Sequence, residues 1–390
     1  SVFRRASRSM FYPQIPADFG WTEEHEVLRQ SARRLLEERC PISEVRRLAA
    51  SPLGHDPALW KEMARLGWLG LVVPEAHGGA GLGHLHLALL LEETGRRLLP
   101  APLLATVLAG FALEAAGSVA ECARLAPALA SGERVATFAF CDLGGGFETG
   151  TIEATADTRD GGFVLRGVKP FVMAGAEAGL VIAPFRERSG ELTFFAVDLP
   201  TRGVRIETEI GVDPTRRSAR LVFDNAFVAA SARLENGGAA TLQRVHVRSF
   251  AALAAEMVGG AESTLLMTRD YAIARKQFDR QIGAFQAVKH PIVDVMIGVE
   301  MARTHVLAAA AALDHARDLA ETPARMAKAI ASEVYPMAVR RAVQLHGGYG
   351  FTWDCDAHFY FKRALWSRAM LGDGAHHRRY LAAELLGPAA

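Results

Sequence analysis

Two segments of the sequence bring together residue types that suit the binding of a cofactor with a pyrophosphate. One is Arg275 to Gln286, which reads Arg-Lys-Gln-Phe-Asp-Arg-Gln-Ile-Gly-Ala-Phe-Gln, and the other is Gln344 to Gly350, which reads Gln-Leu-His-Gly-Gly-Tyr-Gly. An Arg guanidinium donates charge-assisted hydrogen bonds to a pyrophosphate, and adjacent glycines, which have no Cβ, let the backbone approach that phosphate closely. Gln amides and an aromatic ring can hold the adenosine. The pair therefore predicts an adenine-dinucleotide site.

Each segment by itself has a simpler interpretation. A Gly-Gly-X-Gly run is often only a loop between two helices. His346, beside the glycines, fits a packing or backbone-bonding role better than a catalytic one. Because the two segments lie between long helical stretches, their combination favours the cofactor site.

The periodicity of apolar residues changes twice along the chain. From about Thr22 to Ala130 they recur at helical spacing. From Arg134 onward the pattern predicts short strands bounded by turn residues, at 135–140, 163–165, 180–184, 192–197, 204–207 and 221–223. Helical spacing then resumes, and one long helix carries an apolar face of Ile292, Val295, Val299 and Val306. Pro336, in a later helical stretch, predicts a kink or a break between two helices.

These changes predict an α+β protein of several domains. We expect a flexible N-terminal segment over 1–20, a helical domain over 21–132, a middle β domain over 133–230 and a C-terminal helical domain over 231–390. The length is more than one core usually needs, and 50% hydrophobic residues are enough to bury several. The strands are expected to form a compact antiparallel barrel or sandwich.

The composition argues against several classes of protein. Lys+Arg 44 against Asp+Glu 43 gives a formal net charge of +1, so no overall field attracts nucleic acid or an anionic membrane. The alanine-rich stretch 306–313 is shorter than the roughly 20 residues of a membrane span. The four cysteines lie far apart and lack Cys-X-X-Cys or Cys/His ligand spacing. We therefore expect a cytoplasmic protein without a metal site.

Several motifs, taken in order over nearly the whole chain, resemble those of the acyl-CoA dehydrogenase family. Besides the two segments above they are Trp60-Lys61-Glu62-Met63, Leu66-Gly67-Trp68, Val73-Pro74-Glu75, Gly78-Gly79, Glu92-Glu93-Thr94-Gly95-Arg96 and Gly167-Val168-Lys169. The resemblance implies a helical domain, a β domain and a C-terminal four-helix bundle. It also implies FAD as cofactor, an acyl-CoA substrate and an electron-transfer acceptor.

The resemblance further identifies the residues expected to contact FAD. In this family the neighbouring subunit holds the adenosine end of each FAD. The residues that match its contacts are Arg275, Phe278, Gln286, Gln344, Gly347 and Gly348.

The catalytic base of the family has no clear counterpart. The family reaction removes a proton beside the thioester carbonyl while the adjacent carbon gives a hydride to the flavin, so a base is required. When the family motif is aligned without gaps from Gly347, Leu371 occupies the position of the usual Glu, and a leucine accepts no proton. A shift of register would bring Asp373 there, although the gapless register matches Asp373 to a Thr near the cofactor. Members with the base on an earlier helix carry it near Ser249 and Phe250, and neither residue is a base.

The segments expected to face the flavin ring also depart from the family. Phe171 to Ala174 replaces Trp-Ile-Thr-Asn, and Met173 lacks the donor that the Thr offers the flavin. Cys141 to Gly146 replaces a Thr-Glu-Pro-Gly-Ala-Gly loop. Either main-chain groups supply the flavin contacts, or the chain no longer holds the ring.

Three hypotheses follow. In the leading one the chain is the non-catalytic partner in an α2β2 acyl-CoA dehydrogenase, as in actinobacterial members that act on steroid side chains. It would then support α,β-oxidation of an acyl-CoA in lipid or steroid catabolism. The second is an active homotetramer with Asp373 as base, and the third is a flavin-free structural paralogue.

Overall fold

The computed structural model describes residues 15–387, which form two compact units, each built from separate stretches of sequence. One, the helical unit, comprises the chain up to Arg47, Gly83–Leu99 and the chain from Phe250 onward. The other, the sheet unit, comprises Leu48–Leu82 and Pro100–Ser249. Most of the N-terminal segment predicted to be flexible lies outside the described residues.

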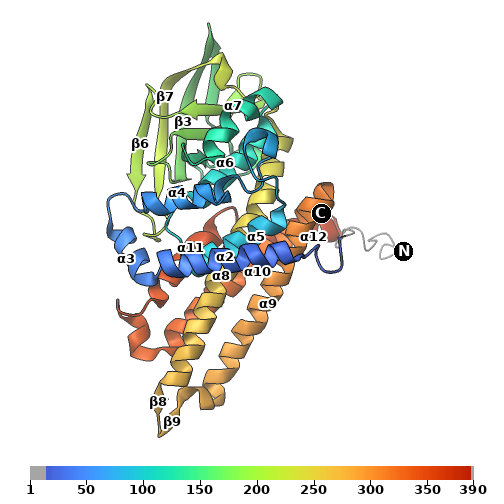
Figure 1. Cartoon of the computed structure of the whole chain (residues 1–390). Helices are drawn as coiled ribbons and strands as arrows, with labels where there is room; N and C mark the ends of the chain where they lie inside the picture. The colour runs from blue at the N-terminus through green and yellow to red at the C-terminus, as the bar shows by residue number, and fades with distance from the viewer. Residues whose placement is uncertain (1–14, 388–390) are drawn as a thin grey trace, which may run out of the picture. The chain divides into compact units, whose positions relative to one another are not determined.

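Long helices dominate the helical unit (Figure 1). It contains α2 (Glu23–Arg39), α5 (His84–Arg96), α9 (Gln286–His315), α10 (Glu321–Leu345), α11 (Ala357–Ala369), α12 (Gly374–Leu386), and parts of α3 (Ile42–Ala50) and α8 (Ala239–Ala274). A short hairpin of β8 (Lys276–Gln277) and β9 (Arg280–Gln281) follows α8. The predicted long helix is α9, with Val295, Val299 and Val306 buried. The predicted break at Pro336 is wrong, because α10 continues through that residue as one helix.

Helices α5 and α8 cross where both carry glycine. A Cβ on Gly95 would lie 1.9 Å from the Glu256 carbonyl oxygen, and one on Gly259 would lie 1.8 Å from the Glu92 carbonyl oxygen. Only glycine permits this approach of two backbones. Partly buried ion pairs flank the crossing: the Arg303 Nη2 atom lies 3.0 Å from a Glu92 oxygen and 2.9 Å from a Glu262 oxygen. The crossing is therefore fixed by packing and by charge.

The sheet unit contains a seven-stranded sheet and three helices of its own. The strands are β1 (Ala136–Phe138), β2 (Thr155–Arg159), β3 (Gly162–Met173), β4 (Leu180–Glu187), β5 (Leu192–Asp198), β6 (Val204–Glu209) and β7 (Ser218–Ala229), and the helices are α4 (Pro57–Arg65), α6 (Leu103–Ala116) and α7 (Val119–Ala130). The order is β1-β4-β2-β3-β7-β6, with β5 on β4. A middle β domain is thus confirmed, but its sheet is mixed, because β1 and β2 both pair with β4 in parallel.

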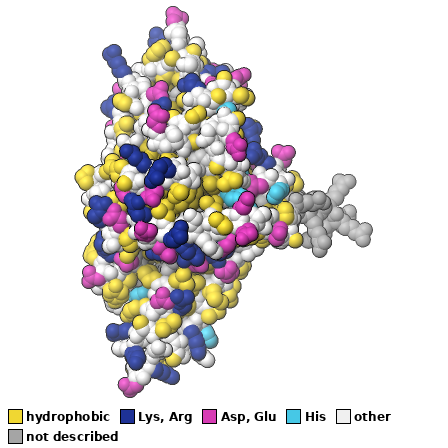
Figure 2. Space-filling model, in the orientation of Figure 1, with side chains coloured by type: hydrophobic (Ala, Val, Ile, Leu, Met, Phe, Trp, Pro, Cys, Tyr) yellow, Lys and Arg dark blue, Asp and Glu magenta, His cyan; other side chains and the backbone are white. Residues whose placement is uncertain are grey.

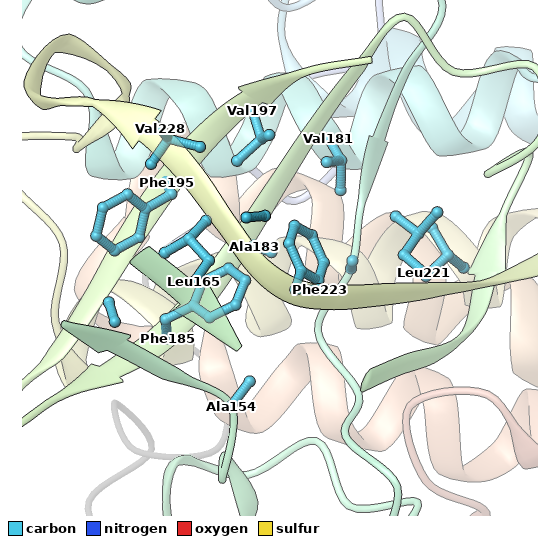
Figure 3. Close-up of a cluster of buried hydrophobic side chains, with 14 residues drawn as sticks. Ala154, Leu165, Val181, Ala183, Phe185, Phe195, Val197, Leu221, Phe223 and Val228 are labelled. Carbon is cyan, nitrogen blue, oxygen red and sulfur yellow. The ribbon is translucent and has the colours of Figure 1, made fainter. Parts of the chain in front are cut away.

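Phenylalanine, valine, leucine and alanine side chains fill the core of the sheet unit (Figure 3). The Phe195 ring meets Phe163 edge-on at 5.0 Å, and Phe185 meets Phe223 edge-on at 5.0 Å. These contacts join β3, β4, β5 and β7 into one core. Strand β2 was not predicted, since only one of its residues, Ala156, is buried, so no period-two pattern marks it.

Basic and acidic side chains are interspersed on the face shown in Figure 2, in keeping with the balanced composition. By length and composition alone, α8 and α9 could cross a membrane, and the most apolar windows of these helices are 72% and 44% buried, respectively. Core helices of globular proteins pass the same test, so this is weak evidence for a membrane span.

Candidate functional site

The first predicted segment forms a tight hairpin at the end of α8 (Figure 1). Phe278 and Asp279 make its turn with φ of 54° and 59°. Positive φ at both central residues is the type I′ geometry that suits hairpins, and Asn or Gly normally occupies the first position. Phe278 stands there instead and is 85% exposed. The exposed Phe278 ring is therefore open to contact from outside the chain.

The hairpin is fixed to the start of α9 by ring contacts. The Phe278 ring meets the Phe285 ring edge-on at 6.0 Å, and the Arg280 guanidinium lies 4.1 Å from the Phe285 centroid. Phe285 is the N-cap of α9, and Gln286 is its first residue and exposed. Unpaired backbone N–H groups and the helix dipole make such an N-terminus favourable to negative charge.

The second predicted segment follows α10. Gln344, in the last turn of that helix, is exposed, as are Gly347 and Gly348. Gly347 has φ +62°, and a Cβ on either glycine would meet no atom within 4 Å. The backbone of this segment is therefore open to a close approach from outside.

Tyr271, which the sequence analysis missed, joins the two segments. It lies on α8 one turn before Arg275, stacks on the His346 ring at 4.3 Å and donates from its hydroxyl to the His346 carbonyl at 3.3 Å. His346 in turn donates from Nδ1 to the Ala342 carbonyl at 2.7 Å, and burial lowers its pKa. His346 thus has the packing and backbone-bonding role expected of it. We call residues 275–286 and 344–348 together the adenosine region.

The segment at Met173 has a different character. Met173 is 2% exposed, and its carbonyl accepts a hydrogen bond of 2.6 Å from the Thr137 hydroxyl. Phe171, 53% exposed with φ 56°, donates from its N–H to Glu209 at 2.8 Å. At the position matched to the flavin-bonding Thr there is thus a buried side chain without a donor.

The loop after β1 is held by a buried ion pair. Asp142 pairs with Lys169 and accepts from the N–H of Ala154 at 2.7 Å. Lys169 is fully buried, and burial lowers its pKa against the opposing effect of Asp142. The same burial raises the pKa of the neighbouring Cys141 thiol to about 11. The charged groups of Asp142 and Lys169 are therefore engaged with other groups of the chain.

The turn at 371–373, here called the base turn, is also bonded from within the chain. Leu371 is 2% exposed with φ 57°, and its carbonyl accepts from His377 Nε2 at 3.0 Å. The Gly372 carbonyl accepts from Lys328 Nζ at 2.6 Å. Lys328 is fully buried, which lowers its pKa to about 7. The available signal for this contact was a lysine on the largely apolar buried face of α10, which also carries Arg325.

Asp373 acts as the N-cap of α12. Its carboxylate accepts from the His376 N–H at 2.9 Å, and this bond is the first cause of its lowered pKa. A lowered pKa makes a carboxylate a weaker base. At the alternative base position, the Ser249 hydroxyl donates to the Val245 carbonyl at 2.7 Å, and the buried Phe250 ring contacts His377 at 4.7 Å.

Comparison with known proteins decides the family. The N-terminal, middle and C-terminal domain models of acyl-CoA dehydrogenase match residues 22–133, 137–226 and 236–386. The chain belongs to the acyl-CoA dehydrogenase family. It is 32% identical over 369 residues to acyl-CoA dehydrogenase IpdE2 of Mycolicibacterium smegmatis, which covers 93% of this chain and 99% of that protein.

Two solved structures that are each named for a pair of proteins are similar to the chain. A chain of the ChsE4-ChsE5 complex from Mycobacterium tuberculosis superposes with a TM-score of 0.86 at 29% identity, covering 96% of this chain and 100% of that one. A variant of the steroid enzyme Tcur3481-Tcur3483 gives 0.83 at 31% identity, covering 93% and 98%. Heteromeric assemblies thus occur among the structural neighbours.

Acyl-CoA dehydrogenases depend on FAD, and the adenosine region fits one end of it. Within the described residues the Arg275 side chain makes no hydrogen bond or ion pair, and neither Gln286 nor Gln344 bonds through its amide. In these two segments a guanidinium, two amides and two open glycines are therefore exposed. The segments at Met173 and at the base turn do not present matching donors or a base.

Proposed function

We propose that this chain is the partner subunit of a heteromeric acyl-CoA dehydrogenase and supplies the adenosine half of an FAD site completed by a catalytic subunit. The observation that carries the proposal is the contrast at Arg275 and Leu371. The Arg275 side chain is exposed and has no partner among the described residues, and Leu371 is buried where the base would stand. Similarity to the ChsE4-ChsE5 complex supports it.

Each residue of the adenosine region has a role in this proposal. Arg275 would donate to the pyrophosphate, and Gly347 and Gly348 would admit it close to the backbone. Gln286 and Gln344 would bond the adenosine, with the Phe278 ring against it. When bound, FAD accepts the hydride in acyl-CoA oxidation. The positive end of α9 would add favourable electrostatics for the phosphates.

An exposed apolar stripe supports assembly with another subunit. Val293, Met296, Ile297 and Met301 on α9 are between 43% and 51% exposed. Their spacing places them on one face of the helix. A contiguous apolar face next to the adenosine region is expected where a second chain packs.

The remaining details of the proposal follow from the same relatives. The substrate would be an acyl-CoA of lipid or steroid catabolism, oxidised in the cytoplasm on the catalytic subunit, which would pass electrons to a separate acceptor. The assembly would be α2β2. Domain limits of 21–132, 133–230 and 231–390 are proposed for dissecting the chain.

The test compares the chain alone with the chain co-expressed with a neighbouring acyl-CoA dehydrogenase gene product. Alone it should bind little FAD and oxidise no acyl-CoA with an artificial electron acceptor. Co-expression should give a yellow complex with stoichiometric flavin. Stoichiometric flavin and turnover in the isolated chain would contradict the proposal, and a colourless, inactive mixture would favour a flavin-free paralogue.

A further inference from the structure

Two histidines stack face to face inside the helical unit. His25 on α2 and His86 on α5 have ring centroids 3.7 Å apart and an interplanar angle of 27°. His25 is 6% exposed. Both ring nitrogens of His86 are buried, and neither has a hydrogen-bond partner among the described residues. Stacking and burial without an acidic partner favour the neutral form of both rings.

His25 also closes the N-terminus of α2. Its Nδ1 accepts from the Thr22 N–H at 3.1 Å and lies 2.7 Å from the Thr22 hydroxyl. This is the return bond of a capping box, here made by a histidine in the place of Glu or Gln. Because Nδ1 accepts, a proton arriving at Nδ1 removes the acceptor and breaks the cap.

The charged groups around the pair are engaged elsewhere. Asp314, at the end of α9, accepts from the N–H groups of His84 and Leu85 at 2.7 and 3.0 Å and lies 2.9 Å from His84 Nδ1. On α2, Glu26 bonds Arg29, whose guanidinium lies 5.8 Å from the Trp21 ring. Glu24 and Asp314 favour protonation of His25 only through space. No described acidic residue bonds either stacked ring.

We propose that the His25–His86 pair is a pH-sensitive contact: uptake of a proton at mildly acidic pH breaks the cap of α2 and its stack on α5 together, releasing the N-terminal turns of α2. A metal site is not the explanation, because no group of three or more potential ligands gathers within the described part of the chain. The inference does not depend on the function proposed above.

The direction of the effect follows from linkage. Burial is the first cause that lowers the pKa of both histidines, and His25 lowers that of His86 further. The released state therefore binds protons more readily. The contact is fully stabilising above the free histidine pKa of about 6.5 and weakens as the pH falls below it.

Hydrogen exchange of the full chain tests the proposal. Peptides covering 22–39 should lose protection between pH 7.5 and 5.5, after correction for intrinsic exchange, by roughly tenfold per pH unit for each histidine that gains a proton on release. The variant His25→Gln/His86→Phe keeps a capping amide and a flat ring but cannot titrate. Its α2 peptides should keep their protection.

The matched control is His305→Gln, since His305 on α9 is also a histidine whose pKa burial lowers. This variant should retain the wild-type loss of protection in α2. An unchanged α2 in the wild type at pH 5.5 would overturn the proposal. So would an equal loss in the double variant, or a loss of the same size in peptides throughout the chain.

Discussion

The adenosine region and the base turn differ in whether their polar groups find hydrogen-bond partners within the chain. In the adenosine region, the side chains of Arg275 and Gln344 are exposed and bond nothing in the described chain. In the base turn, the carbonyls of Leu371 and Gly372 accept bonds from buried side chains. Exposed polar side chains without partners contribute little to the stability of the chain. Under the proposed function, a ligand or subunit outside the chain would bind them, whereas the fold alone accounts for the contacts of the base turn.

The same contrast extends to the loop after β1, where the largest effect on stability is expected. Asp142→Ala leaves Lys169 buried without its partner, which should lower the free energy of unfolding by about 3–5 kcal/mol. Arg275→Ala should change it by less than about 0.5 kcal/mol. Urea unfolding of both variants measures the difference. Equal effects would remove the distinction between the two regions.

Substitutions of Asp373 distinguish a helix-capping role from a role as catalytic base. Asp373→Ala should lower the free energy of unfolding by about 1 kcal/mol because α12 loses its N-cap. Asp373→Asn should alter it by only a few tenths, since Asn caps about as well. Turnover of the assembled complex should survive the Asn change. Loss of turnover with flavin retained would instead identify Asp373 as the base.

Relief of strain at Phe278 should raise stability while it weakens cofactor binding. Phe278→Asn suits the type I′ turn and should stabilise the chain by roughly 0.5–1 kcal/mol. FAD affinity of the complex should fall with loss of the ring. Thermal unfolding and flavin titration give the two values. A destabilised variant with unchanged flavin affinity would show that Phe278 serves packing.

The pH dependence of the Asp373 cap is the smallest effect. Its pKa is lowered in the folded chain, so its contribution is complete above the unfolded pKa of about 3.9 and is lost as the pH falls through the lower folded value. The stability difference between wild type and Asp373→Ala should therefore shrink from pH 7 to pH 3. A difference that grows on acidification would indicate a raised pKa, as in a base held protonated.

Local patterns predicted most of the fold. The apolar stripe of α9 and the β-rich runs after Arg134 report one buried face each, so the helices and the β domain follow from the sequence. The apolar pattern does not indicate the direction in which neighbouring strands run. The parallel pairing of β1 and β2 with β4 was therefore not predicted. The non-contiguous units likewise arise from long-range contacts such as the crossing at Gly95 and Gly259.

The site was predicted less completely. The motifs predict the residues of the adenosine region and the absence of a base at Leu371, and these stay predictions. The contacts of Tyr271 and Lys328 were not predicted, because they link elements far apart in sequence. The strain at Phe278 is a property of the backbone that composition does not reveal. Spacing alone could not show that Asp373 caps a helix.

Flavin affinity of the assembled complex tests the central claim most directly. Arg275→Ala or Gln344→Ala in this chain removes a proposed contact to the partner's FAD; the Arg275 contact is charge-assisted and worth on the order of 1.5–3 kcal/mol, or about tenfold or more in affinity. Arg269→Ala, an exposed arginine earlier on α8, is the matched control. We predict that the first two release flavin while Arg269→Ala and Phe171→Ala do not. Flavin released by Phe171→Ala but retained by Arg275→Ala would show that this chain holds its own flavin ring.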